Sequence, residues 1–206
     1  MAAIQALILD YGGVLSWPQP DDWFQIVAER LGVAPDAFHA AYWHHRPAYD
    51  AGLHARDYWR RVLDMLSPSR AAVSVEVLIQ MDVASWTEYR DELWSLAQSF
   101  RVLGGRTAFL SNGVPEVMAR IRADRSLESW FDVVVVSCEV GAAKPDPLIY
   151  EICLSRLGVD ADQALFVDDR LENVEGAAKL GIRTLHFTAA DTMKQLAHLT
   201  SRVVRS

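Results

Sequence analysis

Short apolar runs with the length of a β-strand alternate with helix-length segments through the second half of this 206-residue chain. The predicted strands cover 106–110, 133–136, 164–167 and 184–187, and the predicted helices between them cover 115–121, 147–157 and 171–180. Because these strands are mostly apolar along their length, both faces of their sheet are expected to be covered. An alternation of this kind predicts βαβ units and a parallel sheet of the α/β class.

A first strand is predicted near the start of the chain, where Leu7-Ile8-Leu9 precedes Asp10 and the pair Gly12-Gly13. An apolar run that stops at a carboxylate and two glycines indicates a buried strand that ends in a tight loop. Asp10 then lies at the carboxyl edge of the sheet, where ligands bind in open α/β folds. Asp10 is therefore a candidate nucleophile or metal ligand, although a turn or a helix cap would show the same pattern.

The segment between the first strand and the rest of the sheet is predicted to be helical, with helices over 21–31, 35–49, 55–66, 74–82 and 86–100. The run 73–77 is rich in β-branched residues and is equally compatible with a strand. We therefore expect one α/β core, residues 1–15 and 101–206, interrupted by an all-helical insertion, residues 16–100. Six of the seven tryptophans lie in or beside this insertion. Aromatic residues at helical spacing favour a helical core over the wall of a substrate pocket.

Two further motifs carry polar groups that suit an anion. Ser111-Asn112-Gly113 follows an apolar run, and a hydroxyl with neighbouring backbone N–H groups can bind a phosphate oxygen, although this tripeptide is also a common turn and helix cap. Lys144 is one of only three lysines in the chain, and it lies in a loop with Pro145 and Pro147. Its compact positive charge is suited to holding a phosphate and a carboxylate together.

The pair Asp168-Asp169 follows three apolar strand residues. Two adjacent carboxylates at the end of a buried strand repel each other unless a cation or hydrogen bonds offset their charge. Magnesium takes one or two protein carboxylates together with substrate phosphate. Asn173 follows Asp169 by one helical turn, so its amide is expected to face the same site and support the ligands. The pair therefore predicts a Mg²⁺ site.

Composition excludes several other classes of function. The net charge of -7 argues against a nucleic-acid-binding surface, and no apolar run reaches the ~20 residues that cross a bilayer. Cys138 and Cys153 lack the spacing of a metal site and are too few for a disulfide framework. With a first strand this close to Met1 we expect no leader peptide, and hence a cytoplasmic enzyme. The oligomeric state stays open, with a homodimer among the states that the sequence allows.

Taken together, the motifs at Asp10, Ser111, Lys144 and Asp168-Asp169 resemble those of the haloacid dehalogenase-like hydrolase superfamily, and the helical insertion resembles its first type of cap domain. The resemblance implies a Rossmann-like sheet of order 5-4-1-2-3. It also implies that Asp10 attacks phosphorus to form an aspartyl-phosphate. Ser111 and the Asn112 N–H would hold the phosphoryl oxygens, and Lys144 would neutralise charge. Asp10, the Gly12 carbonyl and Asp169 would bind magnesium, with Asp168 acting through water.

The sequence departs from the family pattern at Gly12, where family phosphatases carry a second aspartate that acts as general acid and base. Such catalysis is typically worth ~10² to 10⁴ in rate, so turnover of an alkyl phosphate is expected to be slow unless His44, His45 or an ordered water substitutes. The two adjacent histidines do not share a helix face, and Pro47 behind them predicts a helix end.

The function predicted is a Mg²⁺-dependent hydrolase, a phosphatase acting on a small phosphorylated metabolite. Two alternatives stay open. A haloacid dehalogenase needs no acid and also resembles Ser-Asn-Gly at the second motif, but usually lacks the paired metal carboxylates. A non-catalytic phosphate-binding module would keep the fold without turnover. A phosphonatase is excluded because the insertion contains no lysine for a Schiff base.

Overall fold

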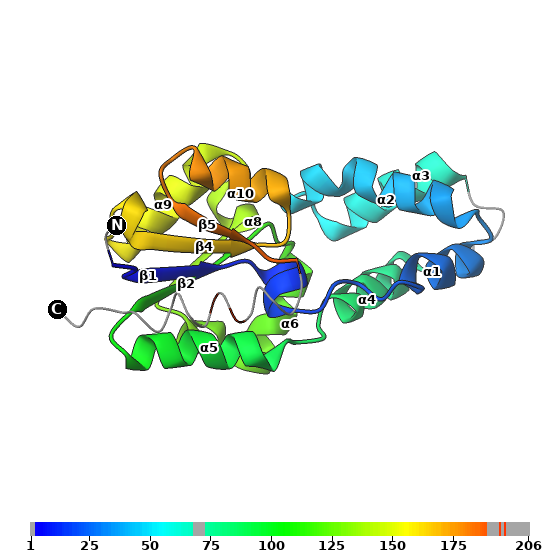
Figure 1. Cartoon of the computed structure of the whole chain (residues 1–206). Helices are drawn as coiled ribbons and strands as arrows, with labels where there is room; N and C mark the ends of the chain where they lie inside the picture. The colour runs from blue at the N-terminus through cyan, green and yellow to red at the C-terminus, as the bar shows by residue number, and fades with distance from the viewer. Residues whose placement is uncertain (1–2, 68–72, 189–193, 195, 197–206) are drawn as a thin grey trace.

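A five-stranded parallel sheet forms the centre of the protein (Figure 1). The structure is a computed structural model that describes residues 3–67, 73–188, 194 and 196, so the end of the predicted core segment 101–206 lies outside the described residues. The strands lie in the order β3-β2-β1-β4-β5. This is the predicted order 5-4-1-2-3 seen from the opposite edge, and it confirms the α/β fold. The strands are β1 (Ala6–Leu9), β2 (Arg106–Ser111), β3 (Val133–Val136), β4 (Ala164–Asp168) and β5 (Arg183–His186).

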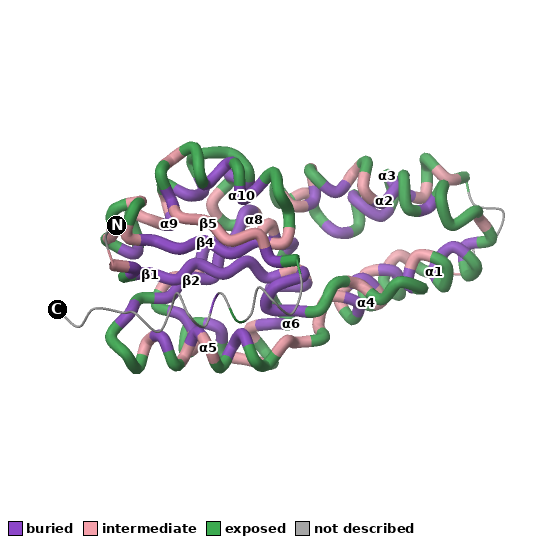
Figure 2. Tube along the Cα trace, in the orientation of Figure 1, coloured by how far each residue is buried: buried purple, intermediate pink, exposed green. Residues whose placement is uncertain are grey.

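Helices cover both faces of the sheet, and alternate residues of each strand point to opposite faces. Ile8 and Leu110 contribute to one hydrophobic core with α9 (Pro147–Leu157) and α10 (Leu171–Ala178). Leu7 and Phe109 contribute to the other with α5 (Asp91–Val102) and α6 (Pro115–Arg125). Figure 2 shows the buried strands between these exposed helical surfaces. Short helical segments complete the core: η1 (Tyr11–Leu15), α7 (Leu127–Trp130), α8 (Ser137–Val140) and η2 (Ala161–Gln163).

Four helices form a lobe that projects beyond the carboxyl ends of the strands (Figure 1). They are α1 (Trp23–Leu31), α2 (Pro35–Asp50), α3 (Ala55–Leu66) and α4 (Val75–Ser85). The interior of the lobe is aromatic, and Phe38, Tyr42 and Trp59 are fully buried in it. Trp23, Trp59 and Trp94 are buried in the core as expected, whereas Trp43 and Trp86 are only partly buried and Trp17 is exposed.

Two neighbouring backbone segments connect the lobe to the core. Ser16 pairs with Tyr89 in an antiparallel bridge, and the Arg90 N–H donates to the Leu15 carbonyl over 2.9 Å. After Arg90 the chain enters α5, which packs against β2, and the Trp94 indole N–H donates to the Leu15 carbonyl over 2.8 Å. We therefore propose that the insertion ends near Arg90 and that α5 belongs with the sheet, in place of a boundary at residue 100.

Two local predictions were wrong, and the structure decides a third case that the sequence left open between helix and strand. The helix predicted over 86–100 begins only at Asp91. Helix α2 does not end before Pro47 but continues to Asp50, because a proline near a helix terminus removes only one backbone hydrogen bond and the last turn buries Tyr49. The run 73–77 contains the start of α4 rather than a strand, and the Ser74 hydroxyl caps this helix by accepting from the Val77 N–H over 3.3 Å. Among the described residues, no helix has the length and apolar character needed to cross a membrane.

Candidate active site

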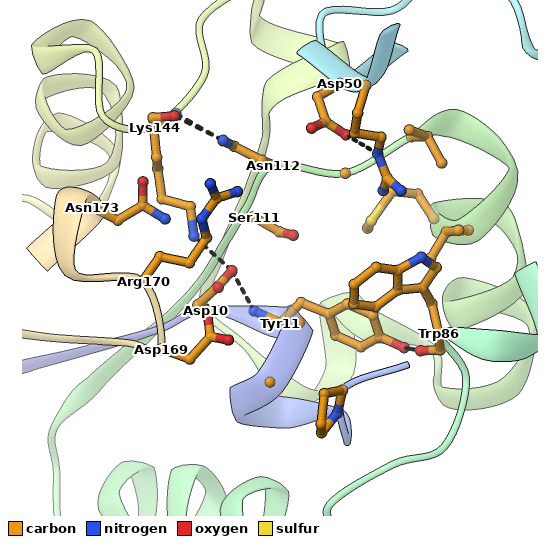
Figure 3. A pocket seen from close by; sticks show the side chains of 18 of the residues that line it. Asp10, Tyr11, Asp50, Trp86, Ser111, Asn112, Lys144, Asp169, Arg170 and Asn173 are labelled. Carbon is orange, nitrogen blue, oxygen red and sulfur yellow. Dashed lines mark hydrogen bonds and ion pairs between the residues drawn. The ribbon is translucent and has the colours of Figure 1, made fainter. Parts of the chain in front are cut away.

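Three carboxylates from distant parts of the chain meet at the carboxyl edge of the sheet. Asp10 directly follows β1, and Asp168 and Asp169 lie at the end of β4. Strands β1 and β4 are neighbours, so their ends lie side by side. One carboxylate oxygen from each of the three residues lies within 4.8 Å of those of the other two. Ser111, at the end of β2 on the other side of β1, is buried and lines the same pocket (Figure 3).

Lys144 places one positive charge among these carboxylates. Its Nζ lies 2.6 Å from Asp10 Oδ1 and 2.6 Å from Asp168 Oδ2, and it donates to the Leu110 carbonyl over 3.1 Å. The side chain is only 1% exposed. Burial by itself lowers the pKa of the ammonium, but the charges of Asp10 and Asp168 outweigh burial and the pKa is raised. Lys144 is therefore held as a cation.

The side chain of Asn112 fixes the loop that carries Lys144. Its Nδ2 donates to the Lys144 carbonyl over 2.8 Å, and its Oδ1 accepts from the Lys144 N–H over 2.7 Å. From the sequence we expected a role only for the backbone N–H of Asn112, and no pattern in the sequence pairs the side-chain amide with residue 144. The structure therefore adds a positioning contact that sequence reasoning missed.

Asp168 is enclosed by hydrogen-bond donors. Its Oδ2 is paired with Lys144, and its Oδ1 accepts from the Arg170 N–H over 2.8 Å. Asn173 Nδ2 lies 3.0 and 3.1 Å from the two oxygens. Asn173 thus faces the cluster as expected, although it contacts Asp168 and not Asp169. Both oxygens of Asp168 are occupied, which makes this residue a support for its neighbours.

Asp169 and Asp10 carry the charge that the surrounding protein compensates least. Burial, and then the charge of Asp168, raise the pKa of Asp169 to about 6. The same two causes raise the pKa of Asp10 well above its ordinary value, although its Oδ1 also accepts from the Tyr11 N–H over 2.6 Å. If all three carboxylates are ionised, the single positive charge of Lys144 leaves the cluster with two uncompensated negative charges. Oxygen ligands with excess negative charge fit a divalent cation such as Mg²⁺.

The loop after Asp10 must contain glycine to approach this cluster. Gly13 has a φ of 75°, and a Cβ at this position would lie 2.3 Å from Asp169 Oδ2. A side chain would therefore displace the carboxylate. Gly12 has an ordinary φ of -64°, and it lines the pocket beside Asp10 and Asp169.

A cavity of about 330 Å³ extends from the acidic cluster towards the helical lobe. Helix α2 contributes Trp43, Arg46 and Asp50 to its wall, and spacings of three and four residues place them on one helix face. His44 and His45 do not line the cavity, because they occupy other faces of the same helix. The expectation that these histidines substitute for the missing aspartate therefore finds no support in their positions.

The indole of Trp86 lies beside Gly12. A Cβ added at Gly12 would lie 3.2 Å from Cζ3 of Trp86, and its other two nearest atoms belong to the same indole. The Tyr11 hydroxyl donates to the Trp86 carbonyl, and the indole N–H donates to the Tyr42 hydroxyl over 3.3 Å. Sequence reasoning had interpreted Trp86 as core, and it missed Arg46 and Asp50 as pocket residues.

Known proteins share both the sequence pattern and the fold of this chain. The family model described as haloacid dehalogenase-like hydrolase matches residues 4–181. Acyl-CoA dehydrogenase family member 10 of Mus musculus is 46% identical over 70 residues, which are 34% of this chain and 6% of that protein. Phosphoserine phosphatase of Thermus thermophilus is 34% identical over 101 residues, 47% of this chain and 41% of that protein. The chain thus spans less than half the length of either relative.

A solved structure of a HAD-family enzyme from Bacteroides thetaiotaomicron superposes on this chain with a TM-score of 0.76 and 20% identity, covering 92% of this chain and 96% of the other. The same enzyme has been solved in complex with magnesium and inorganic phosphate, with a TM-score of 0.72 and 20% identity. That complex covers 91% of this chain and 96% of the other. At this level of identity the likeness establishes the fold.

Proposed function

Because this chain belongs to the haloacid dehalogenase-like hydrolases, we propose that it is a Mg²⁺-dependent phosphatase that hydrolyses a small phosphorylated metabolite. The observation that carries the proposal is the convergence of Asp10, Asp168 and Asp169 around Lys144 at one sheet edge. A phosphoserine phosphatase among the relatives supports the reaction class. The complex of the Bacteroides thetaiotaomicron enzyme with magnesium and inorganic phosphate supports the metal and the product.

In this proposal Asp10 is the nucleophile. One of its carboxylate oxygens attacks phosphorus, the bond to the leaving oxygen breaks, and an aspartyl-phosphate forms. Ser111 and the Asn112 N–H hold the phosphoryl oxygens, and Lys144 offsets negative charge between Asp10 and the phosphoryl group. Water then attacks phosphorus, which releases inorganic phosphate and restores the carboxylate.

Asp10, Asp169 and the Gly12 carbonyl would hold the magnesium ion. When bound, the ion supplies positive charge to the carboxylates and to the phosphoryl oxygens. Asp168 acts indirectly in this scheme, because its two oxygens already accept hydrogen bonds from Lys144, Asn173 and a backbone N–H.

The test is release of inorganic phosphate from 4-nitrophenyl phosphate by the wild-type chain and by Asp10→Asn, each with and without magnesium. We expect release that requires the metal and that is lost in Asp10→Asn, while circular dichroism shows the variant to be folded. Chloride release from 2-chloropropionate without magnesium would instead identify a dehalogenase. Binding of phosphate and magnesium without release of either product would identify a non-catalytic module.

A further inference from the structure

The indole of Trp86 presents an apolar surface beside Gly12, the position at which family phosphatases carry the aspartate that donates a proton. A Cβ at Gly12 would meet its indole carbons at 3.2, 3.8 and 3.9 Å. Gly12 and Trp86 therefore fit together, since any larger residue at position 12 would need the same space. The indole position is fixed, because both the carbonyl and the indole N–H of Trp86 take part in hydrogen bonds.

The remaining polar side chains of this wall are already engaged. Tyr11 directs its hydroxyl proton to the Trp86 carbonyl. The guanidinium of Arg46 pairs with Asp50 over 2.8 Å and donates to the Tyr42 hydroxyl. A carboxylate in an ion pair accepts protons in hydrogen bonds rather than donating them. Among the described residues of this wall we therefore find no side chain placed to protonate a departing oxygen.

We infer that this site acts on phosphate esters of acidic, planar alcohols, such as phenols and enols, whose oxygen leaves as a stable anion while the planar group packs against Trp86. This inference rests on the proposed function and narrows its substrate class. An indole face suits a flat apolar group, because two aromatic rings in offset stacking attract each other beyond the effect of the buried area.

The chemical step balances without an enzymic acid. An Asp10 oxygen forms a bond to phosphorus, the phosphorus–oxygen bond of the ester breaks, and the electron pair leaves with the aryl or enolate oxygen. That anion takes its proton from water after departure. An alkoxide is far too basic to leave in this way, so hydrolysis of an alkyl ester depends on a general acid. With Gly12 in place of the aspartate that acid is absent, and general acid catalysis contributes ~10² to 10⁴ in rate.

The experiment compares three esters with the wild-type chain and magnesium: 4-nitrophenyl, phenyl and benzyl phosphate. Phenyl and benzyl phosphate both carry an apolar ring, but only phenyl phosphate releases an acidic alcohol. Since kcat/KM reports the steps up to departure of the leaving group, we expect it to fall from the nitrophenyl to the phenyl ester and to be about 10²-fold lower again for benzyl phosphate. Glucose 6-phosphate, as a polar alkyl ester, should be no better than benzyl phosphate.

Variants at the two paired positions provide the matched test. Trp86→Ala should raise KM for phenyl phosphate. It should leave unchanged the ratio of kcat/KM for phenyl phosphate to kcat/KM for benzyl phosphate. Gly12→Asp/Trp86→Ala has room for a carboxylic acid beside Asp10. Because this acid can protonate the alkoxide of benzyl phosphate, the variant should lower that kcat/KM ratio by about tenfold or more. In Gly12→Asn/Trp86→Ala the asparagine has the shape of the aspartate but no acidic proton. This variant should not lower the kcat/KM ratio.

Two results would overturn the inference while leaving the phosphatase proposal intact. One is a wild-type kcat/KM for benzyl phosphate or glucose 6-phosphate equal to that for phenyl phosphate. The other is an equal decrease of the phenyl-to-benzyl kcat/KM ratio in Gly12→Asp/Trp86→Ala and Gly12→Asn/Trp86→Ala. If none of the esters releases phosphate in the presence of magnesium, both the inference and the proposed function are wrong.

Discussion

Replacing Lys144 by methionine should destabilise the protein far more than an ordinary lysine substitution does. Methionine keeps the length and much of the volume of the side chain but removes its charge. The ammonium is 1% exposed and lies 2.6 Å from both Asp10 and Asp168. Its loss leaves two buried carboxylates without their partner.

The magnitude follows from the burial of this ion pair. Removing one partner of a buried pair costs about 3–5 kcal/mol, because the remaining charge is buried without compensation. Two carboxylates share Lys144, so we expect a value near the upper end of that range. A native domain has a free energy of unfolding of only about 5–15 kcal/mol. Lys144→Met should therefore lose a large fraction of its stability.

Urea unfolding in EDTA, monitored by tryptophan fluorescence, measures this loss. Lys179→Met is the matched control, because Lys179 is exposed on the surface and its loss should change stability by less than about 0.5 kcal/mol. Lys144→Met/Asp168→Asn removes one of the uncompensated charges and should recover part of the lost stability. If Lys144→Met unfolds at the same urea concentration as Lys179→Met, the cluster does not depend on this ion pair and the reasoning is refuted.

Three further predictions concern the surroundings of the cluster. Gly13→Ala should lower the affinity for Mg²⁺ by about tenfold or more, measured by titration calorimetry, since its Cβ would displace Asp169 from its position 2.3 Å away; unchanged affinity would show that Asp169 does not hold the ion. Asn112→Ala should lower the free energy of urea unfolding by about 1–3 kcal/mol, because it removes two hydrogen bonds to the Lys144 backbone, and a loss confined to kcat would contradict this. Burial raises the pKa of Asp82 in the folded lobe. Between the unfolded pKa and the folded pKa, the folded state therefore binds more protons than the unfolded state. The contribution of Asp82 to the free energy of unfolding then falls as the pH rises through this window. The difference in unfolding free energy between Asp82→Asn and wild type should therefore shift in favour of Asp82→Asn as the pH rises over that window, and a difference that is constant with pH would disprove the shift.

The sequence was sufficient for the architecture because each strand and helix is encoded locally. Apolar runs of strand length that end at Asp10, Ser111 and Asp168 required a parallel sheet with these residues at one edge. The sheet order came from the resemblance to a known family and was confirmed. Local signals were weaker at element ends, and for that reason the helix end expected at Pro47 and the start of α5 were predicted wrongly.

What the sequence could not determine is which side chains face each other across the insertion. Trp86 is 74 residues from Gly12 along the chain, and its contact with the loop after β1 depends on how the lobe folds back over the sheet. The face of α2 that carries Arg46 and Asp50 depends on the lobe in the same way, and the contact of the Asn112 amide with the Lys144 backbone depends on how two distant segments of the core pack together. Periodicity identifies a buried helix face, but only the packing of one element on another decides what it is buried against. The residues at the sheet edge can therefore be identified from the sequence, whereas the wall that we propose selects the substrate is assembled only when the chain folds.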